Sequence, residues 1–443
     1  MRRAFVRGAF TGISLLFALL LEETDARAQQ CSSPYLSTCI NSDTYWPHAG
    51  PQRFAAVGSA ETVADRQIAF GLVTTYLSRP IIINGPSPGG AGTDQFAVDN
   101  QVNANFLFAY GITDRLQLDI GVPITLVQTG AGTSPLTAGR AIRDTSVRDM
   151  RFGFAYALVP RRRIDPWKAA DEGGPGKGFA LVSRLTMSAP VGDNADFAGE
   201  RSLVFGPSLA ADYRVWRMFF GADLGARLRP VTEFAGARVG SQITSALGAG
   251  FDILPRDALS VLLEGRAYVN LPEQHTTQQS AFGISSRPNG DVIVPAEWML
   301  GLRSAPLLGG DISFFGGGGG PIPISASPIT VPRFRFVLGI TYAPIQRDTD
   351  DDGVPDRIDR CPTQAGERGG ERPGCPLEAT PPAVPAAPPP PRPNAKPMER
   401  HPIDTELPPN LGPAPSSTTP AAQEPPTSSS PREGAERKVE TRP

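Results

Sequence analysis

The sequence predicts an all-β fold, an antiparallel transmembrane β-barrel of about twelve strands, and three observations predict it. Segments between residues 67 and 345 alternate apolar residues with small or polar ones, which is the period of a strand with one apolar face. Short turns and long loops alternate between these segments, and aromatic residues recur near the segment ends. Together these features favour strands that cross a lipid bilayer.

The composition excludes several other classes of protein. The chain has 42 Lys and Arg against 44 Asp and Glu, a formal net charge of −2, so no bulk basic field is available for nucleic acid. Its 47 glycines and 47 prolines disfavour a helical bundle. The one long apolar run lies at the N-terminus, so no later helix of about 20 apolar residues could span a membrane.

Residues 1–28 have the layout of a secretory signal peptide. An arginine-rich start precedes the apolar run Ile13–Leu21, and Ala26 and Ala28 frame a cleavage site. Export would place the mature chain in an oxidising compartment, where close cysteine pairs form disulfides. We therefore expect one bond between Cys31 and Cys39 and another between Cys361 and Cys375.

Residues 29–66 form a cysteine-containing N-terminal segment, and two positions are open for it: inside the barrel as a plug, or in the periplasm. The barrel itself is expected over residues 67–345. Its strands are predicted near residues 67–77, 101–111, 115–127, 147–158, 178–190, 202–214, 217–229, 242–254, 258–270, 293–304, 310–316 and 333–344. Leu116–Val122 shows the alternation most plainly.

The connections between these strands indicate the kind of barrel. Short ones fall near 112–114, 215–216, 255–257 and 305–309, and long Gly/Pro/Asn/Ser-rich ones lie between them. Short turns at one rim and long loops at the other are typical of barrels in the outer membrane of a Gram-negative bacterium. Residues 159–177 are an exception, a long connection where a short turn is expected. A soluble β-sandwich or propeller is the alternative, but its apolar faces would have to share a core.

Isolated charges stand on the polar faces, which would line the lumen. These candidate lumen residues are Arg151, Arg184, Asp212, Asp223, Arg227, Glu264, Arg266 and Arg335. Mixed signs favour ion pairs that hold a narrow lumen together, whereas a ring of one sign would indicate an ion-selective constriction. A narrow passive path for small solutes is the alternative, because a barrel of this size lies between side-chain-filled and water-filled barrels.

An acidic motif follows the last predicted strand and has the spacing of a calcium loop. The expected ligands, at loop positions 1, 3, 5, 7, 9 and 12, are Asp348, Asp350, Asp352, Val354 through its carbonyl, Asp356 and Asp359. Gly353 at position 6 permits the sharp turn. Crowded carboxylates repel one another unless a cation lies among them. The motif therefore predicts calcium as a cofactor.

This segment, from Asp348 to Pro362, resembles a thrombospondin type-3 repeat. Together with Gly374–Pro376 it is similar to the junction after the barrel in proteins of the outer-membrane protein A type. The resemblance implies that residues 346–376 form a rigid, calcium-dependent spacer closed by the Cys361–Cys375 bond. Members of that type usually continue into a peptidoglycan-binding domain. Here residues 377–443 are Pro-rich instead, and we expect a disordered tether.

The resulting functional prediction is an outer-membrane barrel with a periplasmic calcium-binding spacer, acting as an envelope scaffold and possible passive pore for small solutes, and not as an enzyme. Its expected partners are outer-membrane lipid and, through the tail, periplasmic or cell-wall components, with no nucleic acid. A secreted or surface calcium-dependent adhesion protein is one alternative. A barrel hydrolase is another, since His275 lies near Glu273 and Ser280 in the sequence.

Overall fold

The computed structural model describes residues 31, 35–85, 93–136, 139–161, 178–254, 258–280, 283–307, 311–325, 329–345, 347–350, 352–356, 358–367 and 372–376. The chain divides into two compact units, Met1–Glu378 and Ala379–Pro443. The predicted signal peptide, the Pro-rich tail and most of the connection 159–177 lie outside the described residues. Among the described residues, no helix is long and apolar enough to cross a bilayer.

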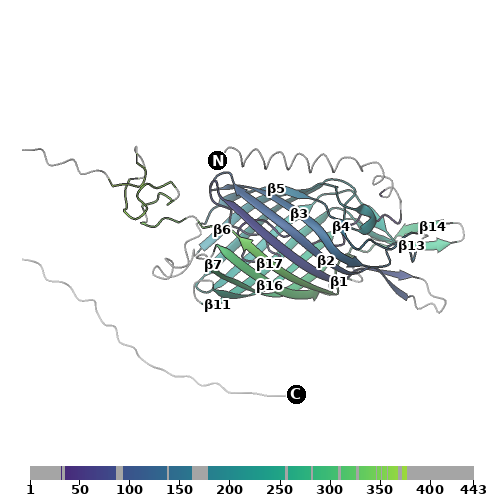
Figure 1. Ribbon diagram of the computed structural model, residues 1–443. Coiled ribbons are helices and arrows are strands. Elements are labelled where there is room, and N and C mark those ends of the chain that lie inside the picture. Colours follow the sequence, from purple (N-terminus) through teal and green to yellow (C-terminus); the bar gives the residue numbers. More distant parts are fainter. Residues whose placement is uncertain are drawn as a thin grey trace, which may run out of the picture. The chain divides into compact units, whose positions relative to one another are not determined.

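Twelve antiparallel strands close into a barrel, as the sequence predicts (Figure 1). They are β1 (Ile68–Gly85), β2 (Thr93–Gly111), β3 (Leu116–Thr129), β5 (Arg151–Val159), β6 (Gly178–Ser188), β7 (Val204–Val215), β8 (Met218–Arg227), β11 (Gln242–Leu254), β12 (Leu259–Asn270), β15 (Ala296–Leu307), β16 (Ile312–Pro321) and β17 (Phe334–Tyr342). Closure is made by β1, which pairs with both β2 and β17. The barrel therefore has no free sheet edge.

Several elements differ from the predicted ranges. β1 and β2 pair as far as Gly85 and Thr93, across bulges near Ile81, so both strands are longer than predicted. The strand predicted at 147–158 is divided into β4 (Ser146–Val147) and β5. Two predicted loops contain the hairpins β9 (Thr232–Phe234) with β10 (Ala237–Val239), and β13 (His275–Ser280) with β14 (Gly283–Pro288). The sequences of β13 and β14, HTTQQS and GISSRP, contain no apolar alternation, so this signal could not reveal the hairpin.

The outer surface of the barrel is apolar. In β5, Phe152, Phe154, Tyr156 and Leu158 are exposed, while the residues between them are buried. The same arrangement exposes Leu300 in β15. A contiguous apolar exterior on a closed barrel is the surface that faces hydrocarbon in a transmembrane barrel.

The two rims of the barrel differ. The short-turn rim carries the β2–β3, β7–β8, β11–β12 and β15–β16 connections, and the long-loop rim carries the β3–β5, β6–β7, β8–β11 and β12–β15 connections. One turn of 3-10 helix, η1 (Asn194–Asp196), lies in the β6–β7 loop.

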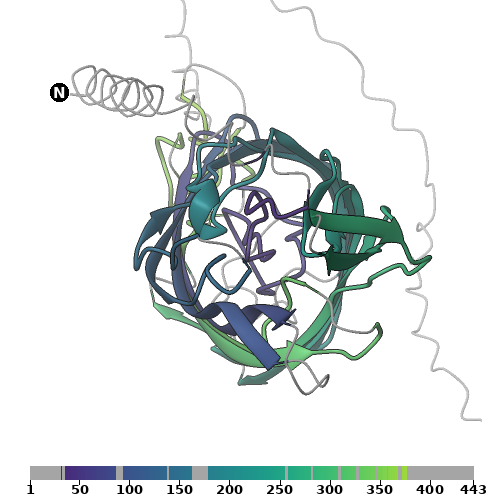
Figure 2. The ribbon, with the colours of Figure 1, turned by 90° about the vertical axis from the view of Figure 1, so that its right-hand side faces the viewer.

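Residues 35–66, here called the plug, pass through the inside of the barrel (Figure 2). At the long-loop rim, Leu36 forms a β-bridge with Phe234. At the short-turn rim, the Arg66 amide donates to the Gly111 carbonyl at 2.8 Å. The plug therefore runs from one rim to the other and then continues into β1. Of the two positions open for residues 29–66, the described part occupies the lumen.

Candidate functional site: a plugged lumen

The wall of the lumen carries charged side chains of both signs. Every lumen residue predicted from the sequence lies on the inner face of the barrel. Those that are buried are Arg151, Arg184, Asp212, Arg227, Glu264, Arg266 and Arg335. Asp223 is half-buried, and its Oδ2 atom has no hydrogen-bond partner among the described residues. The alternation of β-strands places these polar residues inside because their neighbours face lipid.

Some of the charged residues on the inner face of the wall form ion pairs with one another. Glu297 on β15 accepts hydrogen bonds from Arg266 at 2.9 Å and from Arg335 at 2.8 Å. Arg214 on β7 pairs with Asp252 on β11. Buried charges are stable only when they are paired and hydrogen-bonded. Two of these pairs, Arg335 with Glu297 and Arg214 with Asp252, link strands that are not adjacent in the barrel.

Other wall charges bind the plug. Arg161, just after β5, pairs with Glu61 of the plug at 2.8 Å. Arg303 donates to the Gln52 carbonyl at 3.0 Å. The wall amide of Gln117 also participates, because its Oε1 accepts the Val63 N–H at 2.6 Å. The wall therefore supplies partners for plug backbone groups that would otherwise be buried without hydrogen bonds.

Glu264 on β12 holds the middle of the plug. Its carboxyl group accepts the backbone N–H groups of three consecutive residues, Ala55 at 2.8 Å, Ala56 at 2.6 Å and Val57 at 3.0 Å. Glu264 is buried, and hydrogen bonds to a carboxylate are about twice as strong as neutral ones. Three such bonds from one side chain fix the backbone of this stretch against the wall.

Phe54 packs in a socket formed by two inward-facing glycines. Gly221 on β8 and Gly248 on β11 are directly paired across the sheet. A Cβ atom at either position would lie 2.6 Å from the Phe54 ring, inside van der Waals contact. Phe54 is buried and also packs on Phe219, with ring centroids 5.3 Å apart. The two glycines have no side chain, and the Phe54 ring of the plug occupies the space that side chains would take at these positions.

Asp43 connects the N-terminal half of the plug to the wall. Its Oδ1 atom accepts from Arg335 Nη1 at 2.7 Å, and its Oδ2 accepts from Asn103 Nδ2 at 2.9 Å. The Thr75 hydroxyl also donates to Oδ2, at 3.3 Å. The donors come from β17, β2 and β1, which are neighbours in the barrel.

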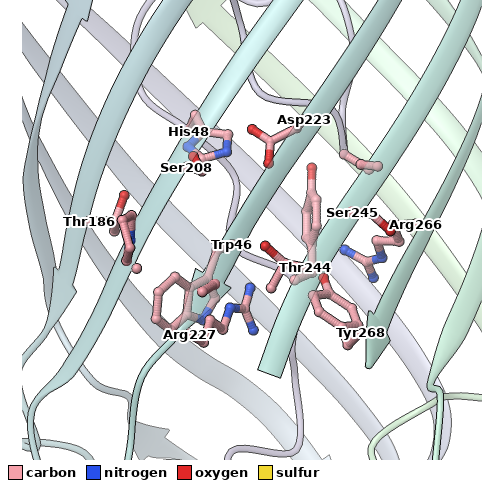
Figure 3. Close-up of a pocket in the computed structure, with 16 residues that line it drawn as sticks. Trp46, His48, Thr186, Ser208, Asp223, Arg227, Thr244, Ser245, Arg266 and Tyr268 are labelled. Carbon is pink, nitrogen blue, oxygen red and sulfur yellow. The ribbon is translucent and has the colours of Figure 1, made fainter. Parts of the chain in front are cut away.

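Trp46 lies in the lumen beside Arg227 (Figure 3). The Arg227 guanidinium lies 4.0 Å from the centre of its ring, and that of Arg151 lies 5.7 Å away. Arg227 also donates to the Thr44 carbonyl at 2.9 Å. The cavity here, which also borders Asp223, measures about 60 Å³. Such a volume holds only a few water molecules.

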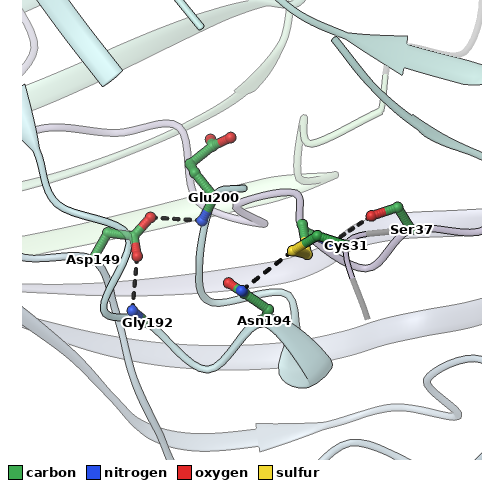
Figure 4. The surroundings of a disulfide bond; sticks show 7 residues. Cys31, Ser37, Asp149, Gly192, Asn194 and Glu200 are labelled. Atoms are coloured by element: carbon green, nitrogen blue, oxygen red, sulfur yellow. Dashed lines mark hydrogen bonds between the residues drawn. A yellow bond between two sulfur atoms is a disulfide. The ribbon is translucent and has the colours of Figure 1, made fainter. Parts of the chain in front are cut away.

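A disulfide anchors the start of the plug near the long-loop rim (Figure 4). Cys31 is bonded to Cys39, as the sequence predicts, and the Asn194 amide donates to Cys31 Sγ at 3.4 Å. Nearby, Asp149 accepts the N–H groups of Gly192 at 2.8 Å and Glu200 at 2.6 Å.

Burial, together with the neighbouring Glu200 carboxylate, raises the pKa of Asp149 to about 7. The folded state therefore holds this proton more tightly than the unfolded chain does. The contribution of this group to stability is therefore greatest below pH 3.8, falls as the pH rises from there, and has been lost once the pH passes about 7.

The described side chains around His275, from the possible hydrolase site, do not form a catalytic relay. His275 Nδ1 lies 2.8 Å from Ser286 Oγ and 3.3 Å from Glu233 Oε2, and Arg238 contacts the other ring nitrogen at 3.1 Å. A relay needs the hydroxyl and the carboxylate on opposite nitrogens of the imidazole. Here both lie at the same nitrogen. The side chain of Ser280 is outside the described residues.

The acidic loop after β17 brings carboxylates together. Ligand atoms of Asp348, Asp350 and Asp352 lie within 4.8 Å of one another. Gly353 has φ +86°, the left-handed conformation of a sharp turn. Asp356, a predicted ligand, instead accepts from the Thr349 amide and hydroxyl, each at 2.7 Å.

The other predicted features of this loop are placed as follows. The Val354 N–H donates to Asp352 at 2.7 Å. Asp359 accepts the N–H of Cys361 at 2.6 Å. Cys361 is disulfide-bonded to Cys375, which is the predicted pairing.

The fold and the filled lumen define an outer-membrane type of β-barrel. No family model and no curated protein match the chain. Among solved structures it is similar to an outer-membrane channel from Pseudomonas putida F1, at 11% identity and TM-score 0.42, over 64% of this chain and 98% of that one. It is also similar to the NanC porin, at 7% identity and TM-score 0.36, over 62% and 100%.

A third similar structure is the P. putida toluene transporter TodX, at 10% identity and TM-score 0.33, over 69% of this chain and 100% of that one. At such low identities and TM-scores, these similarities assign no function to the chain.

The plug contacts were the part of the site that sequence patterns missed. Alternation revealed the inner wall because it depends on neighbouring residues, but residues 35–66 show no such repeat. One signal was present: the inward glycines Gly221 and Gly248 mark a wall that something closely approaches. Which segment approaches it depends on contacts between residues far apart in the sequence.

Proposed function

We propose that this protein is a channel for small solutes in the outer membrane of a Gram-negative bacterium, closed at rest by the plug. The observation that carries the proposal is the plug itself, held in a polar lumen by side chains of the wall. A twelve-stranded barrel is wider than barrels filled by their own side chains. Without residues 35–66, charged and amide groups would line a hydrated passage.

The mode of attachment supports a plug that can leave the lumen. Its polar contacts with the wall are hydrogen bonds and ion pairs, and wall arginines lie over the Tyr45 and Trp46 rings. Apolar plug residues such as Ile40, Phe54 and Ala60 also pack against buried wall residues. Each bond can be replaced by a bond to water, so the net stabilisation from each is modest. We assign the short-turn rim to the periplasm because outer-membrane barrels have their short connections there. Lipid would then contact the apolar exterior, and the tail could reach periplasmic or cell-wall components.

Removing residues 40–60 is expected to open the channel. In planar bilayers the mature full-length protein should be mostly closed, and the deletion variant should show discrete conductance steps. A chain cut after Pro376, which keeps the plug, is the matched control and should remain closed. Folding of each variant is checked by heat-modifiable migration in electrophoresis. A folded deletion variant that is silent would contradict the channel and favour a closed scaffold.

We also propose that the loop after β17 binds calcium and stiffens the segment that follows the barrel. The convergence of Asp348, Asp350 and Asp352 supports this, because oxygen ligands so arranged suit a hard cation. Asp350 Oδ2 and Asp359 Oδ2 are buried and have no hydrogen-bond partner among the described residues. A cation would satisfy these oxygens.

Asp352→Ala is expected to weaken calcium binding by the mature protein at least tenfold, because it removes one of three converging carboxylates. Isothermal titration with calcium measures the affinity. Glu367→Gln, a change of the same charge in the same segment but outside the loop, should leave the affinity unchanged. Equal affinities for all three proteins, or no calcium response at all, would contradict the proposed site.

A further inference from the structure

We propose that the wall residues around Asp43 form a binding site for small carboxylate solutes, which the plug occupies with its own carboxylate. This inference rests on the proposed channel and adds to it a class of solute and a means of opening. The plug would then be a tethered competitor. A free carboxylate that binds in place of Asp43 would release the N-terminal half of the plug.

The first observation is the completeness of the site. Asp43 is only 4% exposed, and both of its oxygens are bonded to wall side chains. Arg335 donates to one oxygen, and Asn103 and Thr75 donate to the other. The Tyr45 N–H, at 3.0 Å, is an additional donor from the plug itself. Guanidinium, amide and hydroxyl donors spread over two oxygens match a planar carboxylate.

The second observation is that the site is positioned independently of Asp43. Arg335 is also bonded to Glu297 through Nε at 2.8 Å and through Nη2 at 3.4 Å. Glu297 in turn is bonded to Arg266. These bonds lie within the wall, so the Arg335 guanidinium stays in place when the plug moves. A preorganised donor favours ligand binding because little ordering is required.

The third observation is the charge that Asp43 brings. Glu297 is bonded to both Arg266 and Arg335, and Asp43 of the plug is the second carboxylate bonded to Arg335. Arg148 lies near Asp43 as well, and it contacts the plug through the neutral Asn41 and Ser42 side chains. Asp149 and Glu200 also act on Arg148, but they bond elsewhere in the loops, Glu200 to Arg229. Loss of Asp43 therefore leaves Arg335 with one bonded carboxylate instead of two, and an anion at this position would restore the second.

These observations predict that carboxylates both open the channel and pass through it. A ligand shifts an equilibrium only by its differential affinity for the two states. Here the site is accessible to a solute only when Asp43 has left, so the solute favours the released plug. Chloride is a weaker competitor because it cannot accept two directed sets of hydrogen bonds.

The test records the mature full-length chain in planar bilayers, in sodium acetate and in sodium chloride of equal ionic strength. The open fraction of the wild type should be several-fold higher in acetate. Asp43→Asn keeps the shape and removes the charge, so its open fraction in chloride should rise about tenfold, the loss expected for one charge-assisted hydrogen bond. Acetate should still raise its open fraction, because the wall donors Arg335, Asn103 and Thr75 are unchanged.

Glu61→Gln is the matched control, because Glu61 is the carboxylate that pairs with Arg161 at the other end of the plug. This variant should keep the response to acetate whatever its resting open fraction. Arg335→Gln should lose the response and reduce anion selectivity, measured by the reversal potential in a salt gradient. Heat-modifiable migration confirms that each variant is folded.

Two results would overturn the inference, and they are distinguishable from failure of the channel itself. If the deletion of residues 40–60 conducts while the wild type and Asp43→Asn have equal open fractions in both salts, the channel stands and the carboxylate site is wrong. A persistent acetate response in Arg335→Gln would likewise contradict the carboxylate site and leave the channel standing. If the deletion variant is folded and silent, both proposals fail.

Discussion

Replacing Glu264 by alanine is expected to release the middle of the plug and to destabilise the folded protein by about 3 kcal/mol or more. The change leaves the N–H groups of Ala55, Ala56 and Val57 without their acceptor inside the barrel. Hydrogen bonds to a charged group contribute about 1.5 to 3 kcal/mol each, and their effects within one group do not add fully. Urea unfolding measures the loss of stability, and bilayer conductance measures the release.

Glu200→Gln is the matched control for this prediction. Glu200 is buried and paired with Arg229 near the long-loop rim, so its replacement destabilises the protein without removing a described contact to the plug. A cysteine introduced at Ala60, which is buried, reports plug release by its rate of reaction with a water-soluble thiol reagent. That rate should rise in Glu264→Ala and not in Glu200→Gln. Equal rates in the two variants would show that Glu264 does not hold the plug.

Replacing Gly248 by valine is expected to expel the Phe54 ring from its socket. The Cβ atom alone would lie 2.6 Å from the ring, closer than real Cβ contacts allow. Overpacking of a filled site costs about 1 to 3 kcal/mol, and displacing the ring loses its burial in addition. The variant should unfold at lower urea concentration and conduct more than the wild type.

Substitutions at Phe54 and at Gly265 test whether contact with the Phe54 ring causes the effects of Gly248→Val. Phe54→Ala removes the ring with which the introduced valine would clash. The double variant should therefore lose less free energy of unfolding than the sum of the losses in the two single variants, and a double-mutant cycle measures the difference. Gly265 on β12 is the control, because a Cβ atom there has nothing within 4 Å. Gly265→Val should therefore leave stability and conductance nearly unchanged. Additive effects of Phe54→Ala and Gly248→Val would contradict the socket.

Much of the barrel could be predicted from the sequence because its signals are local. Alternation along a strand records which side faces lipid, as in Phe152, Phe154 and Tyr156, and each such residue is exposed in the structure. The close spacing of the cysteines likewise predicted both disulfide bonds. These patterns arise within about ten residues, where a periodic environment dictates residue type.

The elements that were missed depend on partners rather than on a period. The sequence of the hairpin β13–β14 has no apolar alternation, and β1 continues across the bulges near Ile81 beyond its alternating part. Each of these outcomes is decided by hydrogen bonds that residue spacing does not specify.

Residue periodicity was therefore enough to establish a transmembrane barrel and the charges on its inner wall, because one environment repeats along each strand. The position of residues 35–66 followed only from the folded chain. Glu264 and Ala55 are separated by 209 positions in the sequence, and Arg335 and Asp43 by 292. Closure of the barrel brings such pairs together, and their mutual hydrogen bonding places the plug in the lumen, because buried backbone groups and buried charges must find partners there.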